Sequence, residues 1–215
     1  MVRDDAHLTP RPFVPRHNSN IETADLPPHE REWVKEHRRL ATNYILGYFV
    51  GPPSEEREYF DFQLATELLS ALIANSVRGQ QSLSYAAYAP FHGYAIPVGG
   101  IYASTPAPNP TYHTMLKQIE LIQSLEIPAY FLREFKDGFV LARLAEQMTN
   151  AGQAEALGRA AVYFGDYRMA DGVWDRLASV RPSRLRRAAE RYMRDLRLVY
   201  LGDTTHMLGG WDMEP

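Results

Sequence analysis

Strand-like and helix-like runs of apolar residues alternate along the chain. The run at residues 42–50 is strand-like. This run is aromatic and β-branched on both faces, which is typical of a buried central strand. The Gly-Pro-Pro at residues 51–53 ends it. Residues 31–40 alternate poorly between apolar and polar types, and they predict an edge strand before the buried one.

A helical spacing follows, because apolar residues repeat on one face from Leu64 to Val77. The run predicts a helix of about six turns that packs on one face only. Ser54 is the predicted N-cap, since acidic residues that suit the positive end of a helix dipole come just after it. Gly79 is the predicted end of the helix.

The remaining elements predict a sheet that is mainly antiparallel. Strands at 83–90 and 93–104 are expected to form a hairpin around a turn at Phe91-His92-Gly93, and 105–110 reads as a loop. Helices are then predicted at 111–125, 128–148, 152–164, 173–177 and 183–193, before a last strand at 196–201. Hairpins with one returning strand indicate an α+β fold, with a mainly antiparallel sheet and helices packed on one face.

Length and composition fit one soluble domain after a short arm. The chain has 215 residues, of which 45% are apolar and 23% charged. Residues 1–28 are rich in proline without apolar periodicity, and they predict a linker or arm cut from a longer polypeptide. Residues 29–215 are then expected to form a single α+β domain.

Charge and residue usage exclude several classes of chemistry. The net charge of −3 predicts no nucleic-acid partner and no membrane partner, and no segment is apolar for long enough to span a bilayer. The N-terminus lacks the apolar stretch of a signal peptide. A protein without cysteine works in the cytosol or in the periplasm, so both locations stay open. The absence of cysteine excludes disulfides, thiolate zinc sites and cysteine nucleophiles.

The histidines do not form a zinc motif, so no metal site and no cofactor are predicted in this chain. Near His29 and His37, both the HExxH and the HxxEH spacings fail because Trp33 stands at the required histidine. His92 and His206 are isolated and are interpreted as loop or surface residues. Arginines crowd residues 181–197, where a solvated helix face is favoured over a basic binding face because an apolar stripe runs opposite.

The most informative stretch is residues 76–85, Ser-Val-Arg-Gly-Gln-Gln-Ser-Leu-Ser-Tyr, in which Arg78 closes the long helix and Tyr85 opens a strand. Together with the order of the predicted strands and helices, this stretch resembles the non-catalytic half of the pitrilysin/insulinase and processing-peptidase zinc metallopeptidases. These enzymes use an inverted HxxEH motif. Arg78, Leu83 and Tyr85 match the family's pattern of arginine, polar residues and Gly-Leu-Ala-Tyr. Gly79 replaces its usual acidic residue, and Ser82 replaces its usual glycine.

The resemblance implies a pitrilysin-like half-domain that binds substrate without carrying zinc. Arg78 and Tyr85 would contact a peptide substrate, while a zinc-bearing catalytic half, covalent or separate, would supply the metal. The assembly would hydrolyse peptides in a closed chamber formed by two halves. The alternative is a proteolytically inactive scaffold or assembly subunit of the same fold.

Tyrosines gather on the predicted hairpin. Tyr88, Tyr94 and Tyr102 are candidate substrate-binding residues that could line a peptide-binding wall beside an exposed strand. A sheet whose aromatic residues pack beneath helices is the other interpretation of the same pattern.

Overall fold

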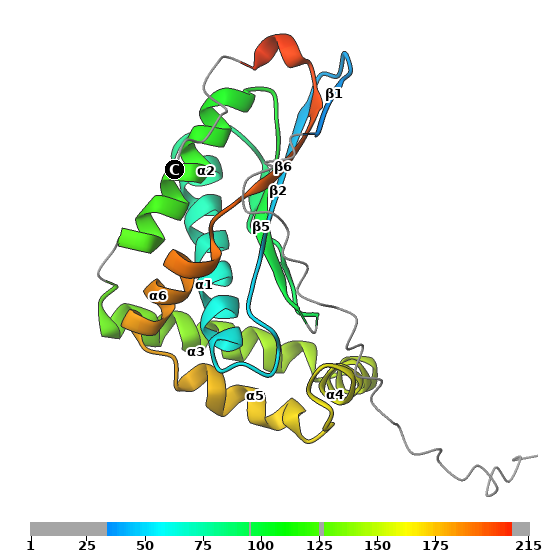
Figure 1. Cartoon of the computed structure of the whole chain (residues 1–215), viewed down its shortest axis with the longest axis vertical. Helices are drawn as coiled ribbons and strands as arrows, with labels where there is room; N and C mark the ends of the chain where they lie inside the picture. The colour runs from blue at the N-terminus through cyan, green and yellow to red at the C-terminus, as the bar shows by residue number, and fades with distance from the viewer. Residues whose placement is uncertain (1–33, 95, 125–126, 208–215) are drawn as a thin grey trace, which may run out of the picture.

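The computed structural model describes residues 34–94, 96–124 and 127–207. One sheet carries the helices on one of its faces (Figure 1). Its strands are β1 Val34–His37, β2 Asn43–Val50, β3 Ala86–Tyr88, β4 Phe91–His92, β5 Val98–Thr105 and β6 Arg197–Gly202. They follow the order β1-β6-β2-β5-β3, and β4 also pairs with β5. Only β1 and β6 run parallel among these strands, so the α+β prediction is confirmed.

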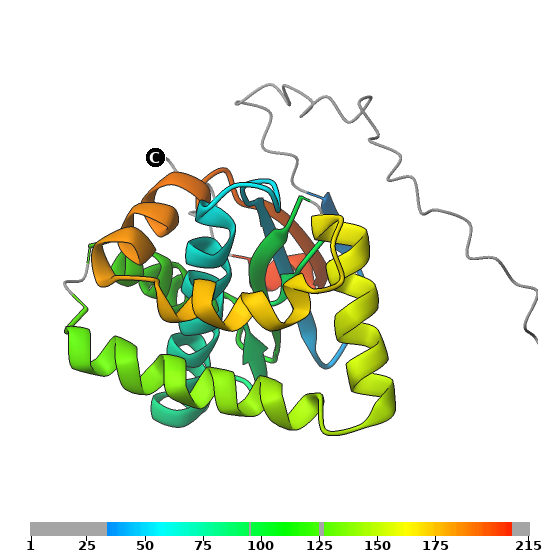
Figure 2. The same cartoon turned by 90° about the horizontal axis from the view of Figure 1, so that it is seen from below.

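The helices form two layers. They are α1 Glu58–Ile73, α2 Pro108–Ser124, α3 Ala129–Glu146, α4 Asn150–Phe164, α5 Met169–Ala178 and α6 Pro182–Tyr192, with π-helix η1 Ala74–Gln80 and 3₁₀-helix η2 Thr204–His206. Helices α1 and α2 pack on the sheet, and α6 packs on both of them. Helices α3, α4 and α5 lie outside (Figure 2) and bury only Leu132, Ala160 and Leu177 respectively.

Strand β2 is central in the sheet, as predicted, but the helices of the described residues cover only one of its faces. Ile45 and Phe49 point into the core, whereas Tyr44 and Val50 are exposed on the opposite face. The interpretation of this strand as buried on both faces was therefore wrong. Its apolar outer residues belong to an open face of the sheet, which has aromatic and aliphatic character.

The long helix was placed correctly, but both predicted ends shift. Ser54 does not cap it, because the Ser54 hydroxyl donates to the Tyr163 carbonyl 2.7 Å away, and α1 begins at Glu58. At the other end the helix widens into η1 and passes through Gly79. It ends at Gln80, two residues before Ser82, whose φ of 53° places it in the left-handed region.

The predicted hairpin turn at Phe91-His92-Gly93 was also wrong. Phe91 and His92 form β4, which pairs with Gly99 and Val98, so the chain turns after His92 rather than at it. The expected loop at 105–110 is shorter than predicted, because α2 begins at Pro108.

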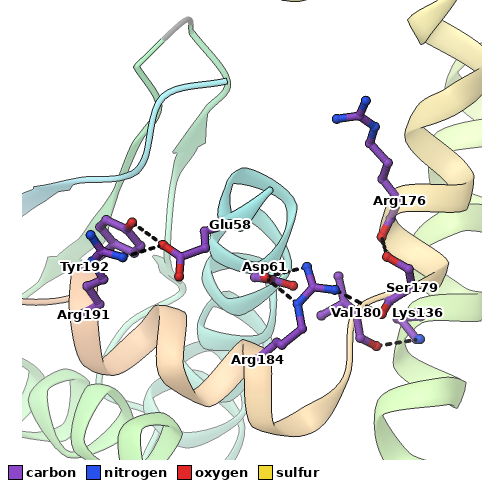
Figure 3. Close-up of polar contacts among 9 residues, drawn as sticks. All are labelled: Glu58, Asp61, Lys136, Arg176, Ser179, Val180, Arg184, Arg191 and Tyr192. Atoms are coloured by element: carbon purple, nitrogen blue, oxygen red, sulfur yellow. Dashed lines mark hydrogen bonds and ion pairs between the residues drawn. The ribbon is translucent and has the colours of Figure 1, made fainter. Parts of the chain in front are cut away.

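The arginine-rich helix α6 is fastened to α1 by side-chain contacts (Figure 3). The Arg184 guanidinium donates to Asp61 through Nε (2.9 Å) and Nη2 (2.7 Å). Arg191 and Tyr192 both donate to Glu58. Part of the predicted solvated arginine face therefore contacts α1.

Candidate functional site

Arg78 and Tyr85 come together at the end of η1, just before β3. The Arg78 guanidinium lies over the Tyr85 ring at 4.7 Å from its centroid. Both side chains are exposed, and Tyr85 is 83% accessible. Arg78 makes no hydrogen bond or ion pair with another described residue, so its five N–H donors remain available to a ligand.

Hydrogen bonds hold the link between these two residues. The Leu83 amide donates to the Val77 carbonyl (2.9 Å), which closes the turn around Ser82. The Ser84 hydroxyl donates to the Ser104 carbonyl (2.8 Å), and the Thr105 hydroxyl donates to the Leu83 carbonyl (2.7 Å). The chain before Tyr85 is thus tied to β5, and Ala86 after it is the register partner of Ser104 on the same strand, so the arginine–tyrosine pair is preorganised.

The left-handed Ser82 explains why the resembling family has glycine at this position. A residue with a Cβ is disfavoured at positive φ, whereas glycine adopts this conformation without the steric cost. Sequence reasoning identified Arg78, Tyr85 and the departure at Ser82. It missed Ser84 and Thr105, which position the pair, because the hairpin register was misplaced.

Tyr88 and Tyr102 lie side by side on the open face of the sheet. They are register partners on β3 and β5, and their ring centroids are 5.0 Å apart. Leu46 of β2 is the partner of Tyr102 on its other side. These residues extend an aromatic and aliphatic surface inward from the edge strand β3.

Tyr94 does not join this group. It stacks on His92, with centroids 5.8 Å apart and planes at 11°, and contacts Tyr163 edge-on. Tyr94 follows β4 near the Val98 end of β5, whereas Ser84 contacts the opposite end. Because β5 is a strand of eight residues, these ends are separated by roughly 20 Å at about 3.4 Å per residue. The three predicted tyrosines therefore divide into a pair on β3 and β5 and a third ring beside His92 and Tyr163.

No group of three or more potential metal ligands occurs within residues 34–94, 96–124 and 127–207. The His37 Nδ1 lies 2.9 Å from the Thr204 hydroxyl, and His92 lies among aromatic rings. His7, His17, His29 and the predicted arm at 1–28 lie outside the described residues. In the described part of the chain, no helix combines the length and apolarity needed to cross a bilayer.

Comparison with known proteins assigns the class of this fold. Residues 6–138 match the sequence profile of the family described as "Peptidase M16 inactive domain". Because the match covers more than half of the chain, the chain belongs to this family. No curated protein matches closely enough to count as a relative.

Solved structures of low sequence identity share the fold. A protease from Helicobacter pylori has a TM-score of 0.70 at 13% identity, over 79% of this chain and 43% of that chain. A peptidase M16 inactive domain from Pseudomonas fluorescens gives 0.69 at 14% identity, over 80% of this chain and 43% of its own. A chain of complex III2 from Candida albicans gives 0.70 at 13% identity, over 82% and 47% respectively. This chain thus spans less than half the length of each.

Proposed function

We propose that the chain is the substrate-binding, non-zinc-bearing half of a zinc metallopeptidase that hydrolyses peptides in a chamber between two halves. The observation that carries the proposal is the Arg78–Tyr85 pair, which is exposed beside an edge strand and follows a link that hydrogen bonds tie to β5. Membership of the M16 inactive-domain family supports a division of labour, in which another half supplies the zinc and the general base.

Arg78 and Tyr85 have the donors that peptide hydrolysis needs. A guanidinium and a phenol both donate hydrogen bonds to a peptide carbonyl, and these bonds strengthen as the carbonyl becomes an oxyanion. The backbone contacts of Ser84 and Thr105 hold the pair in place before substrate arrives. Removing one such donor typically lowers turnover by about 10²–10³-fold.

The open face of the sheet would form the wall of the chamber. Tyr88 and Tyr102 offer aromatic surface to apolar side chains of an extended peptide. In the described part of the sheet, β3 ends the strand order, so its outer edge can pair with a substrate backbone. Tyr94 would contact only a substrate long enough to reach the far end of β5.

The test uses the enzyme assembled with its zinc-bearing half. Arg78→Ala is expected to lower kcat/KM by about 10²-fold or more without changing the zinc content. Tyr85→Phe should lower it less, because the ring remains beside Arg78. Arg187→Ala is the matched control, since Arg187 is exposed on α6 and forms none of the α6–α1 contacts of Figure 3. An Arg78→Ala enzyme as active as the Arg187→Ala control would refute the assignment.

A proteolytically inactive scaffold is the second candidate function. The observation that favours it is the similarity of this fold to a chain of complex III2 from Candida albicans. The two candidates differ in what the partner carries: a peptidase needs an intact HxxEH in the zinc-bearing half, whereas a scaffold does not.

A further inference from the structure

A pocket of about 420 Å³ lies among the first turns of α1, the β4 segment and helices α3, α4 and α5. Figure 2 shows these three helices arranged around the end of α1. Aromatic side chains line much of the pocket, including Tyr59, Phe60, Phe139, Phe164 and Trp174. Tyr59 stands near the start of α1 and Arg78 beyond its end, roughly 30 Å apart at about 1.5 Å per helical residue. The pocket is thus separate from the candidate peptide site.

Tyr59 brings an unused polar group to this aromatic lining. Its ring is fixed by edge-to-face contacts with Phe60 and Phe164, at centroid distances of 5.1 and 5.7 Å. The side chain is only 4% exposed, yet its hydroxyl makes no hydrogen bond with another described residue. The hydroxyl oxygen is not among the fully buried atoms that lack a partner in the described part of the chain, so it keeps accessible surface and can bond to a ligand in the pocket. The hydroxyl is protonated and able to donate at neutral pH, since burial raises the pKa of Tyr59 to about 12 from an ordinary value that is already well above 7.

The charged groups of the pocket are already matched to one another. Arg143 lies 2.8 Å from Glu146 and 3.1 Å from Glu67. Arg159 lies 3.0 Å from Glu155. An anionic ligand would have to displace these carboxylates, whereas a neutral ligand leaves them in place. The charges therefore favour an uncharged occupant.

We infer that this pocket binds a small, neutral aromatic molecule with a hydroxyl or similar hydrogen-bonding group. The ring of the ligand packs against Phe60, Phe164 and Trp174, and its polar group bonds to the Tyr59 hydroxyl. The volume lies within the range of about 300–1,000 Å³ that is typical of small-molecule sites. The inference does not depend on the proposed peptidase role.

The test titrates the full chain with p-cresol and with toluene, which has a similar shape but no hydroxyl. Binding is followed by ligand-observed NMR. We expect saturable one-to-one binding of p-cresol to the wild type. Tyr59→Phe keeps the ring and removes only the hydroxyl, so it should weaken p-cresol binding about tenfold and leave toluene binding unchanged. Ala156→Trp fills the pocket and should abolish the binding of both ligands.

Tyr130→Phe is the matched control, because Tyr130 is exposed and does not line the pocket, so loss of its hydroxyl should not change either affinity. Equal p-cresol affinity in the wild type and in Tyr59→Phe would overturn the inference, as would the absence of saturable binding. Because Tyr59→Phe preserves the packed ring, the test stands even if Ala156→Trp fails to fold. A capped tyrosine peptide that binds more than tenfold tighter than p-cresol would overturn the assignment to a small molecule in favour of a polypeptide side chain.

Discussion

The buried ion pair between α1 and α6 allows a sharp prediction about stability. Asp61 is 2% exposed and Arg184 18%, and one oxygen of Asp61 accepts both guanidinium bonds (Figure 3). The other oxygen of Asp61 has no hydrogen-bond partner among the described residues. Burial raises the pKa of Asp61, although the bonds from Arg184 act in the opposite direction. The cost of removing the Asp61 carboxylate from water therefore outweighs its attraction to Arg184. The intact pair adds little to the free energy of unfolding, but removing one partner alone is strongly destabilising.

Two variants separate these effects. Arg184→Met leaves a buried carboxylate without its counter-ion and should lower the free energy of unfolding by about 2–4 kcal/mol at pH 7, somewhat less than the largest known cases because the carboxyl can take up a proton. Asp61→Leu combined with Arg184→Met replaces both charges with apolar groups. The double variant should remain within about 1 kcal/mol of the wild type.

The cost of Arg184→Met should depend on pH. Losing Arg184 removes the bonds that lower the pKa of Asp61, so the pKa in the folded variant rises further. A carboxyl whose pKa is higher in the folded than in the unfolded state contributes its full stabilisation at pH values below its pKa in the unfolded state. That contribution is lost as pH rises through its pKa in the folded state. The gap between the wild type and the variant should therefore widen as pH rises above the usual range of a carboxyl.

Urea unfolding followed by circular dichroism, repeated between pH 4 and pH 7, measures both effects. Arg159→Met is the matched control, because the Arg159–Glu155 pair is 58% and 64% exposed and should contribute no more than about 0.5 kcal/mol. The reasoning is refuted if Arg184→Met is as mild as this control, or if the double variant is as unstable as Arg184→Met alone.

The remaining predictions concern backbone geometry and use the same unfolding assay. Ser82→Gly should raise the free energy of unfolding by about 0.5–1 kcal/mol, because glycine adopts the left-handed conformation without steric cost. Gly165→Ala, at φ 74°, should lower the free energy of unfolding by about 1 kcal/mol for the converse reason. The opposite signs would contradict the explanation of Ser82. Gly100→Ala should cost more than about 2 kcal/mol, because its Cβ would lie 2.1 Å from the Gly47 carbonyl oxygen. Gly138→Ala should instead raise the free energy of unfolding by roughly 0.5–1 kcal/mol, because the added Cβ inside α3 meets no atom within 4 Å. Equal effects of Gly100→Ala and Gly138→Ala would be inconsistent with the sheet packing.

Local sequence patterns were sufficient for the order of the main elements. The central strand and the long helix followed from apolar spacing, and both occur in the structure. Arg78 and Tyr85 were also identifiable, because each stands at the boundary of an element that the pattern marks. Arg78 lies in the widened turn of η1, and apolar spacing encodes neither that widening nor the cation–π contact with Tyr85.

Tertiary contacts explain the features that sequence reasoning misplaced. Gly93 was interpreted as a turn residue, but a Cβ there would lie 2.8 Å from the Tyr59 hydroxyl oxygen, so its glycine permits close packing instead. A turn centred on His92 would pair Ala86 with Val98, six residues from its observed partner Ser104. Ser54 similarly bonds to the Tyr163 carbonyl on α4, which lies 109 positions away in the sequence, rather than capping the helix beside it.

We propose that this chain completes a peptidase whose metal is held by another half. The most direct measurement titrates this chain into the isolated zinc-bearing half and follows the cleavage of an unfolded polypeptide. We expect activity to rise until the two halves are present in equal amounts. The Arg78→Ala chain should bind the zinc-bearing half as well as the wild-type chain does, without restoring activity. A complex that forms with the wild-type chain but gains no hydrolysis would contradict the account and favour the scaffold function.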